Sequence, residues 1–233
     1  MYFFSALFEE ADLDLAEKAI ASDLKLLEGL LKTDPNNDKL LLMVSQGFGA
    51  YALGFVEDEY PERAEKLYLR GKGYGLRILT GNKNFDRALS KPIGDFEKSL
   101  QSFDHKDVPA LFWTANNWAS WINLNFSNPS ALADLPRVQL LMKRVIQLDP
   151  SYFYGGAHLF FGTIYAARPP ILGGNMKLSK EHFDKCFAFS QEKFLLPYVY
   201  FAKYYLTREF DEETFTSTLG IFQSKQKLFI LKL

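Results

Sequence analysis

The segment from Val145 to Phe187 constrains the fold most, because it combines a helix stop, a new helix start and a stiff connection. Apolar residues close an amphipathic helix before Asp149-Pro150. That dipeptide ends the helix, since the residue before a proline is pushed out of the helical region. Aromatic residues then begin a second helix. The connection that follows, Arg168–Gly174 (RPPILGG), is too long and too rigid for an ordinary turn between helices. The segment therefore predicts a helical hairpin with additional structure at its turn.

The spacing inside this hairpin is typical of a tetratricopeptide repeat. Phe161, Gly162 and Tyr165 stand where such repeats place an apolar residue, a small residue for close helix contact, and an aromatic residue. Phe183 and Cys186, three residues apart, match the core face of the second helix. We predict an all-α fold of divergent tetratricopeptide-like helical hairpins.

The same kind of pattern extends along the whole chain. Asp14 and Glu17 form a possible capping box at the start of the first helix. Residues 40–57 are apolar nearly all round, which predicts a helix at the centre of the fold. Residues 80–107, rich in turn signals, predict short helices and loops. The expected helices are 14–31, 40–57, 62–79, 110–126, 135–148, 195–206 and one from about Asp211. No strand pattern competes with them, so we expect a single helical-repeat domain over residues 1–233.

The composition narrows the class of protein. With a net charge of −1 and a pI near 6.3, the chain lacks the basic footprint of nucleic-acid binders, so no nucleic-acid partner is expected. Its 22 Phe, 12 Tyr and 3 Trp fit a lined cavity, an oligomer interface or a Phe-rich core. No apolar run reaches about 18 residues, and the first residues lack the features of a secretory signal.

The helix at 110–126 carries the strongest candidate ligand site. Trp113, Asn117 and Trp121 share one face at four-residue spacing, with Asn116 beside them. Indoles and fixed amides supply the apolar wall and the few polar groups that small-molecule pockets require. Packing in the core would explain the same pattern, and both alternatives stay open.

Two further sets of residues extend these expectations. Tyr152 and Tyr154, beside Gly155-Gly156, could continue the same ligand-binding or pore wall. The Pro-Gly connection is expected to form either a subunit contact or a rim. The residues expected in that oligomer or loop contact are Pro169, Pro170, Gly173 and Gly174.

No pattern in the sequence indicates catalysis. Residues 47–52 match G-x-G-x-x-A without the strand and acidic residue of a dinucleotide site, so helix packing explains these glycines better. Arg70–Gly75 likewise lacks the end of a phosphate loop. His182 and Cys186, at i and i+4, could share a metal, but Cys186 stands at a core position of the repeat. We therefore predict no metal, no cofactor and no enzyme activity.

Residues 25–71, 107–124 and 152–186 together resemble the T component family of tripartite ATP-independent periplasmic (TRAP) transporters. The resemblance implies a tetratricopeptide-like periplasmic lipoprotein that forms a homotrimer pierced by a pore or cavity. It also implies a partnership with the periplasmic solute-binding protein of a TRAP system, and a small organic ligand.

This sequence departs from the family pattern at its start. The given sequence begins almost directly in the first helix and shows neither a signal nor an early cysteine. The resemblance implies that the full-length form carries a signal and a lipid-bearing cysteine that anchors it. The function it implies is a non-enzymatic accessory component that binds or channels a small, partly hydrophobic ligand. The alternative is a general scaffold that recognises a peptide or protein in a concave groove.

Overall fold

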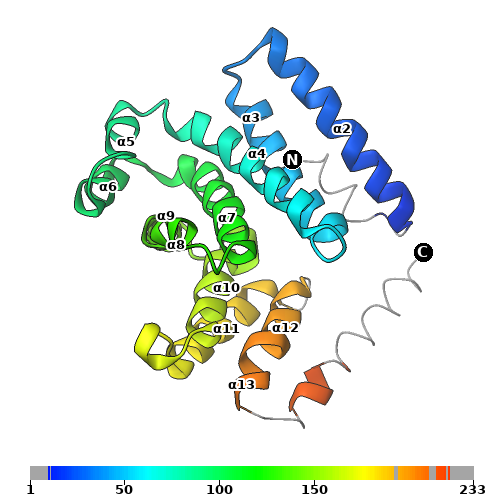
Figure 1. Ribbon diagram of the computed structural model, residues 1–233, viewed down its shortest axis with the longest axis vertical. Helices are drawn as coiled ribbons and strands as arrows, with labels where there is room; N and C mark the ends of the chain where they lie inside the picture. The colour runs from blue at the N-terminus through cyan, green and yellow to red at the C-terminus, as the bar shows by residue number, and fades with distance from the viewer. Residues whose placement is uncertain (1–9, 11, 192–193, 210–213, 219, 221–233) are drawn as a thin grey trace. The chain divides into compact units, whose positions relative to one another are not determined.

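A computed structural model describes residues 10, 12–191, 194–209, 214–218 and 220, which form helices and turns and no strand (Figure 1). The all-α prediction is confirmed over these residues, while the tetratricopeptide likeness of the hairpins stays a prediction. The chain divides into two compact units, residues 1–148 and 149–233. Each unit has a hydrophobic core of its own. The expectation of a single domain stays a prediction.

Helix α2 (Leu13–Thr33) opens the unit of residues 1–148. Its N-cap is Asp12, whose Oδ1 accepts a hydrogen bond from the Leu15 N–H at 3.1 Å. The predicted capping box at Asp14 and Glu17 is therefore wrong, because Asp14 lies inside the first turn, where its charge favours the helix dipole. The buried residues of α2 lie on one face of the helix and are Ala16, Ile20, Leu24, Leu27 and Leu31.

Helix α3 (Asp38–Tyr51) occupies the centre of this unit, as its all-round apolar pattern predicts. The side chain of Asn37 caps its start, and a π-helical turn at Ala52–Val56 continues it. It packs against α2 and against two later helices, α4 (Pro61–Leu79) and α7 (Val108–Leu124). Burial on three sides explains why the helix needs no polar face.

Residues Asp38–Val56 also form a helix long and apolar enough to cross a membrane, with a mean hydropathy of 1.3 over an 18-residue window. Half of that window, 50%, is buried inside the structure. The core helix of a soluble protein has the same length and composition, so this observation is weak evidence for a span.

Short helices follow α4, as the turn signals predict. Helices α5 (Lys83–Ala88) and α6 (Ile93–Ser99) pack through aromatic side chains. The ring of Phe85 lies 5.4 Å from that of Phe96 and 5.3 Å from that of Phe103. All three side chains are buried. This aromatic cluster compensates for helices too short to be stable alone.

Helix α7 continues into α8 (Pro129–Ala133) and α9 (Leu135–Leu148). Helix α7 packs against α3, α4 and α9, so it is buried on more than one side. From α9, the Arg144 guanidinium donates to the Phe103 carbonyl at 2.7 Å and ties the last helix of the unit to its short helices.

The unit of residues 149–233 is built on the hairpin of α10 (Tyr152–Ala167) and α11 (Met176–Ser190). Phe183 and Cys186 are both fully buried, so their predicted position on a core face is confirmed. The side chain of Asn175 caps α11 by accepting from the Leu178 N–H at 3.0 Å.

Three short elements follow α11 in this unit. Helix α12 (Leu196–Tyr200) runs into a π-helical turn at Phe201–Leu206 and then α13 (Thr207–Glu209). The π-helical turn packs against α10 and α11. The helix expected from about Asp211 begins outside the described residues, although 214–218 are helical.

Candidate functional site

Asn117 lies at a buried junction of three helices in the unit of residues 1–148. From α7, its Nδ2 donates to the Ser45 carbonyl of α3 at 3.0 Å and to the Trp113 carbonyl at 2.9 Å. The Ser45 hydroxyl in turn donates to the Gly71 carbonyl of α4 at 2.8 Å. We call Ser45, Gly71 and Asn117 the polar junction. These bonds satisfy the Ser45 hydroxyl and the Asn117 amide nitrogen, which would be costly to bury unpaired, while Asn117 Oδ1 is buried without a hydrogen-bond partner among the described residues.

Glycines give this junction its space. A Cβ at Gly71 would lie 2.6 Å from Asn117 Oδ1, and one at Gly49 would lie 2.8 Å from the same atom. A Cβ at Gly75 would lie 2.1 Å from Thr114 Oγ1. Real side chains do not approach so closely, which confirms helix packing as the role of these glycines.

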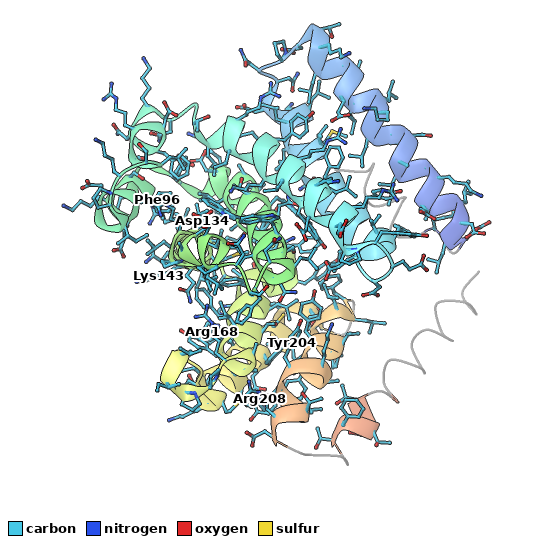
Figure 2. All side chains as sticks on the ribbon, viewed as in Figure 1. Phe96, Asp134, Lys143, Arg168, Tyr204 and Arg208 are labelled. Carbon is cyan, nitrogen blue, oxygen red and sulfur yellow. The ribbon has the colours of Figure 1, made fainter. Side chains whose placement is uncertain are left out.

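A lysine lies against the tryptophans of α7. Lys72 Nζ is 3.7 Å from the centroid of the Trp118 ring and 5.5 Å from that of Trp121, and 4.0 Å from Asp134 Oδ2. Asp134, labelled in Figure 2, also accepts from Trp118 Nε1 at 3.0 Å. Burial lowers the pKa of Lys72, and the charge of Asp134 opposes that shift. We call Lys72, Trp118, Trp121 and Asp134 the lysine cage.

The structure separates the predicted ligand residues of α7 into two groups. Trp113 is 6% exposed and Asn117 is fully buried, so their side chains fill the interior. Trp121 and Asn116 are partly exposed. The sequence patterns did not identify Lys72 or Asp134 as site residues. The one local signal for Lys72 is its position between two glycines, Gly71 and Gly73.

Tyr152 and Tyr154 belong to the other unit, at the start of α10. Phe153, Tyr154 and Gly155 adopt left-handed backbone angles in succession, with φ of 48°, 57° and 74°. Such angles are strained for residues other than glycine. The ring of Tyr154 stacks on Phe194 at 5.0 Å between centroids, and 41% of Tyr154 is exposed. These contacts form an aromatic surface at the start of the helix.

One turn further along α10, two histidines face each other. Nδ1 of His158 lies 2.8 Å from Nδ1 of His182 on α11. Burial, followed by the charge of His182, lowers the pKa of His158 to about 4. Burial also lowers the pKa of His182. We call these two residues the histidine pair. A hydrogen bond between the rings requires one neutral nitrogen as acceptor, so the pair holds at most one proton between its facing nitrogens.

Cys186 bonds to the main chain of α10 and not to the histidine pair. Its Sγ donates to the Tyr154 carbonyl at 3.3 Å, and burial raises the pKa of its thiol to about 12. A thiol of that pKa is a poor nucleophile and metal ligand. Among the described residues, no group of three or more His, Cys, Asp or Glu side chains is arranged to hold a metal ion.

The Pro-Gly connection, predicted as an oligomer contact or rim, forms a compact exposed loop. Ile171 is 91% exposed and Leu172 is 62% exposed, and Pro169 and Pro170 are exposed beside them. Gly173 takes a left-handed φ of 86°. Gly174 leaves no space for a side chain, since a Cβ there would lie 1.8 Å from the Arg168 carbonyl oxygen.

These features define an all-helical protein with buried helix junctions, exposed aromatic and aliphatic surfaces, and no catalytic constellation in the part of the chain that the structure describes. The sequence model of the TRAP transporter T-component family matches residues 9–222, and the chain belongs to that family. This is a family of transport accessories, not a known enzyme family.

The chain is also similar to an uncharacterized protein of Treponema pallidum (strain Nichols). The two are 32% identical over 195 residues, which cover 76% of this chain and 59% of that protein. The match thus spans somewhat more than half the length of this relative.

Proposed function

We propose that this chain is a non-enzymatic accessory component of a TRAP transport system, which docks a periplasmic solute-binding protein and binds a small, partly hydrophobic organic ligand. The observation that carries the proposal is the family match over residues 9–222. A periplasmic or membrane-associated location follows from the same role. A lipid anchor and a homotrimer around a pore are parts of the proposal that rest on the family resemblance.

Docking is tested by mixing the purified chain with a TRAP solute-binding protein from the same organism. Light scattering and native mass spectrometry of each protein alone and of the mixture give their stoichiometry. We expect the chain to be a trimer and the mixture to contain a complex of defined mass. A strict monomer that ignores that partner would overturn this part of the proposal.

The lysine cage is the ligand site that we propose within the unit of residues 1–148. It combines an ammonium group, Lys72, with a partly exposed indole, Trp121, and a neighbouring amide, Asn116. A ligand with an apolar body and one carboxylate or sulfonate matches these groups, since the anion can take the place of Asp134 beside Lys72. Such a site orients its ligand through few polar contacts on an apolar wall.

All three tryptophans of the chain lie on α7, so intrinsic fluorescence reports binding there. The probe is 8-anilinonaphthalene-1-sulfonate, an aromatic anion. Lys72→Met keeps the aliphatic stem and removes the charge, and we expect it to weaken binding by about tenfold, as a charge-assisted contact requires. Phe126→Ala, which removes a side chain 56% exposed beyond α7, is the matched control. Equal affinities in all three proteins would eliminate the cage as the ligand site.

The scaffold alternative gains from one observation: Trp113 is packed in the core instead of lining a cavity. A helical scaffold recognises an extended or helical peptide through a surface groove. If the fluorescence titration fails while a peptide segment of the solute-binding protein binds in isothermal titration calorimetry, the scaffold function replaces ligand binding.

A further inference from the structure

Two aliphatic side chains stand in solvent at the turn between α10 and α11. Ile171 and Leu172 are among the most exposed large hydrophobic residues that the structure describes, and Pro169 and Pro170 extend the same surface. We call these four residues the apolar tip. We propose that the apolar tip inserts shallowly into the surface of an anionic phospholipid membrane. This inference is independent of ligand binding and of docking a solute-binding protein.

The loop presents its side chains in a fixed conformation. The Leu172 N–H and the Gly174 N–H both donate to the Pro169 carbonyl, at 2.9 and 3.1 Å, and the Gly173 N–H donates to the Pro170 carbonyl at 3.0 Å. At its far end, the Asn175 N–H donates to the Tyr165 carbonyl of α10 at 3.0 Å. A loop held this way loses little conformational entropy when it enters a membrane interface.

The charged residues that flank the tip in the sequence are positive. From Pro150 to Lys180 the sequence contains no aspartate or glutamate, while Arg168 and Lys177 stand on either side of the tip. Arg208 of α13, labelled in Figure 2, donates from its guanidinium to the Ala167 carbonyl at 2.9 Å and thus adds a third cation next to Arg168, with Glu209 following it in the sequence. Cations around an apolar projection complement the negative surface potential of anionic lipids.

The size of the tip favours lipid over protein as its occupant. Stable protein interfaces bury about 800 Å² on each partner, far more than two aliphatic side chains and two prolines provide. Membrane interfaces accept a few apolar side chains, and basic residues beside them add electrostatic attraction. A second copy of the chain is the competing occupant.

The first experiment is flotation of the purified chain with vesicles of phosphatidylethanolamine and phosphatidylglycerol, and with vesicles of phosphatidylcholine alone. We expect binding to the anionic vesicles that falls as salt increases. The double variant Ile171→Ser/Leu172→Ser should bind at least about tenfold more weakly, because it removes two aliphatic side chains from the lipid. Lys177→Gln should weaken binding by about fivefold, the contribution of one cation near an anionic surface.

The matched control is Leu26→Ser/Leu30→Ser on α2, whose side chains are 63% and 44% exposed. It removes the same kind of exposed surface elsewhere and should leave flotation unchanged. Because all four substituted side chains are exposed, far-UV circular dichroism and thermal melting should match the parent protein. Flotation that is absent, or equally strong in the tip variant and its control, overturns the proposal.

Insertion itself is measured with an environment-sensitive nitrobenzoxadiazole dye on Ile171→Cys. The native Cys186 is fully buried and its thiol pKa is raised to about 12, so the dye reacts at the introduced thiol. We expect a blue shift and quenching by brominated lipids on vesicle binding. A dye that stays in water overturns insertion. Sedimentation velocity without lipid decides the competing case: a self-association that the tip variant abolishes assigns the tip to a second copy.

Discussion

The polar junction of residues 1–148 (unit 1) and the histidine pair of residues 149–233 (unit 2) both hold polar side chains between packed helices, but with different chemical groups. Each places polar side chains between packed helices, where an unpaired group would be costly. Ser45 and Asn117 join α3, α4 and α7 through groups that do not titrate. His158 and His182 join α10 and α11 through groups that do.

This difference makes the two units respond differently to their surroundings. Hydroxyl, amide and carbonyl groups keep their hydrogen bonds from acidic to neutral pH, so the contribution of the polar junction to stability depends on its packing and not on pH. The histidine pair depends on shape and on protonation. We therefore expect substitutions at the junction to have effects that are independent of pH, and those at the pair to change the pH dependence itself.

The largest effect is expected from Gly71→Ala. The new methyl group would lie 2.6–2.8 Å from three atoms of the buried Asn117 side chain, which must move or lose its hydrogen bonds. We expect the free energy of unfolding to fall by about 2–4 kcal/mol, combining overpacking with a disrupted buried amide. Urea denaturation followed by tryptophan fluorescence measures it, since every tryptophan lies on α7.

Gly73→Ala is the control for this substitution. It lies on the same helix, and a Cβ there would meet nothing within 4 Å. Alanine should raise stability by about 0.5–1 kcal/mol at such a position, because it restricts the unfolded chain. If Gly71→Ala and Gly73→Ala changed the free energy of unfolding by the same amount, the tight packing of Gly71 against Asn117 would be contradicted.

The second prediction concerns how the free energy of unfolding depends on pH through the histidine pair. Both pKa values are lowered in the folded state, that of His158 to about 4, so the unfolded chain binds protons more readily as pH falls. Stability should therefore be complete above the ordinary histidine pKa near 6.5 and decrease toward pH 4, by about 1–3 kcal/mol in all. The charged neighbours on α11 are Lys185, which lowers both pKa values, and Glu181, which raises that of His182.

Thermal melting by circular dichroism between pH 7.5 and 4.5 measures this dependence. His158→Gln retains a polar side chain without a titrating ring and should flatten the slope of melting temperature against pH. His105→Gln is the control, since this histidine is exposed in the other unit. An unchanged slope in His158→Gln would show that other groups dominate the acid response.

The sequence predicted helices much better than it predicted contacts between them. The expected ranges 62–79 and 135–148 agree with α4 and α9 to within one residue, because proline starts and apolar periodicity are local signals. The first N-cap was misplaced by two residues, since Asp12 and Asp14 are equivalent as local signals. Only the packing of the helix against its neighbours distinguishes them.

The candidate site was harder to predict for a related reason. Asn117 was singled out, but its partner Ser45 lies 72 residues away, and no local pattern pairs an amide with a distant carbonyl. His182 was considered with Cys186 at i+4, whereas its contact is His158, 24 residues away. Spacing along one helix identifies which residues share a face, and only the fold decides which face meets which partner.

The smallest change in stability is expected from a substitution at Ser45 of the polar junction. Ser45→Ala removes the hydroxyl that donates to the Gly71 carbonyl at 2.8 Å and accepts a long hydrogen bond from Asn117 Nδ2 at 3.4 Å, and it leaves the main-chain acceptor of Asn117 in place. We expect a loss of about 1 kcal/mol, the typical contribution of one neutral hydrogen bond, and the same loss at pH 7.5 and pH 5. Ser99→Ala is the control, because this buried hydroxyl bonds only within its own helix, to the Phe96 carbonyl at 2.7 Å. Its loss should cost less, since the carbonyl remains within a helical turn. A Ser45→Ala effect that grew toward pH 5 would contradict the distinction between the two units, because no titrating group takes part in the junction.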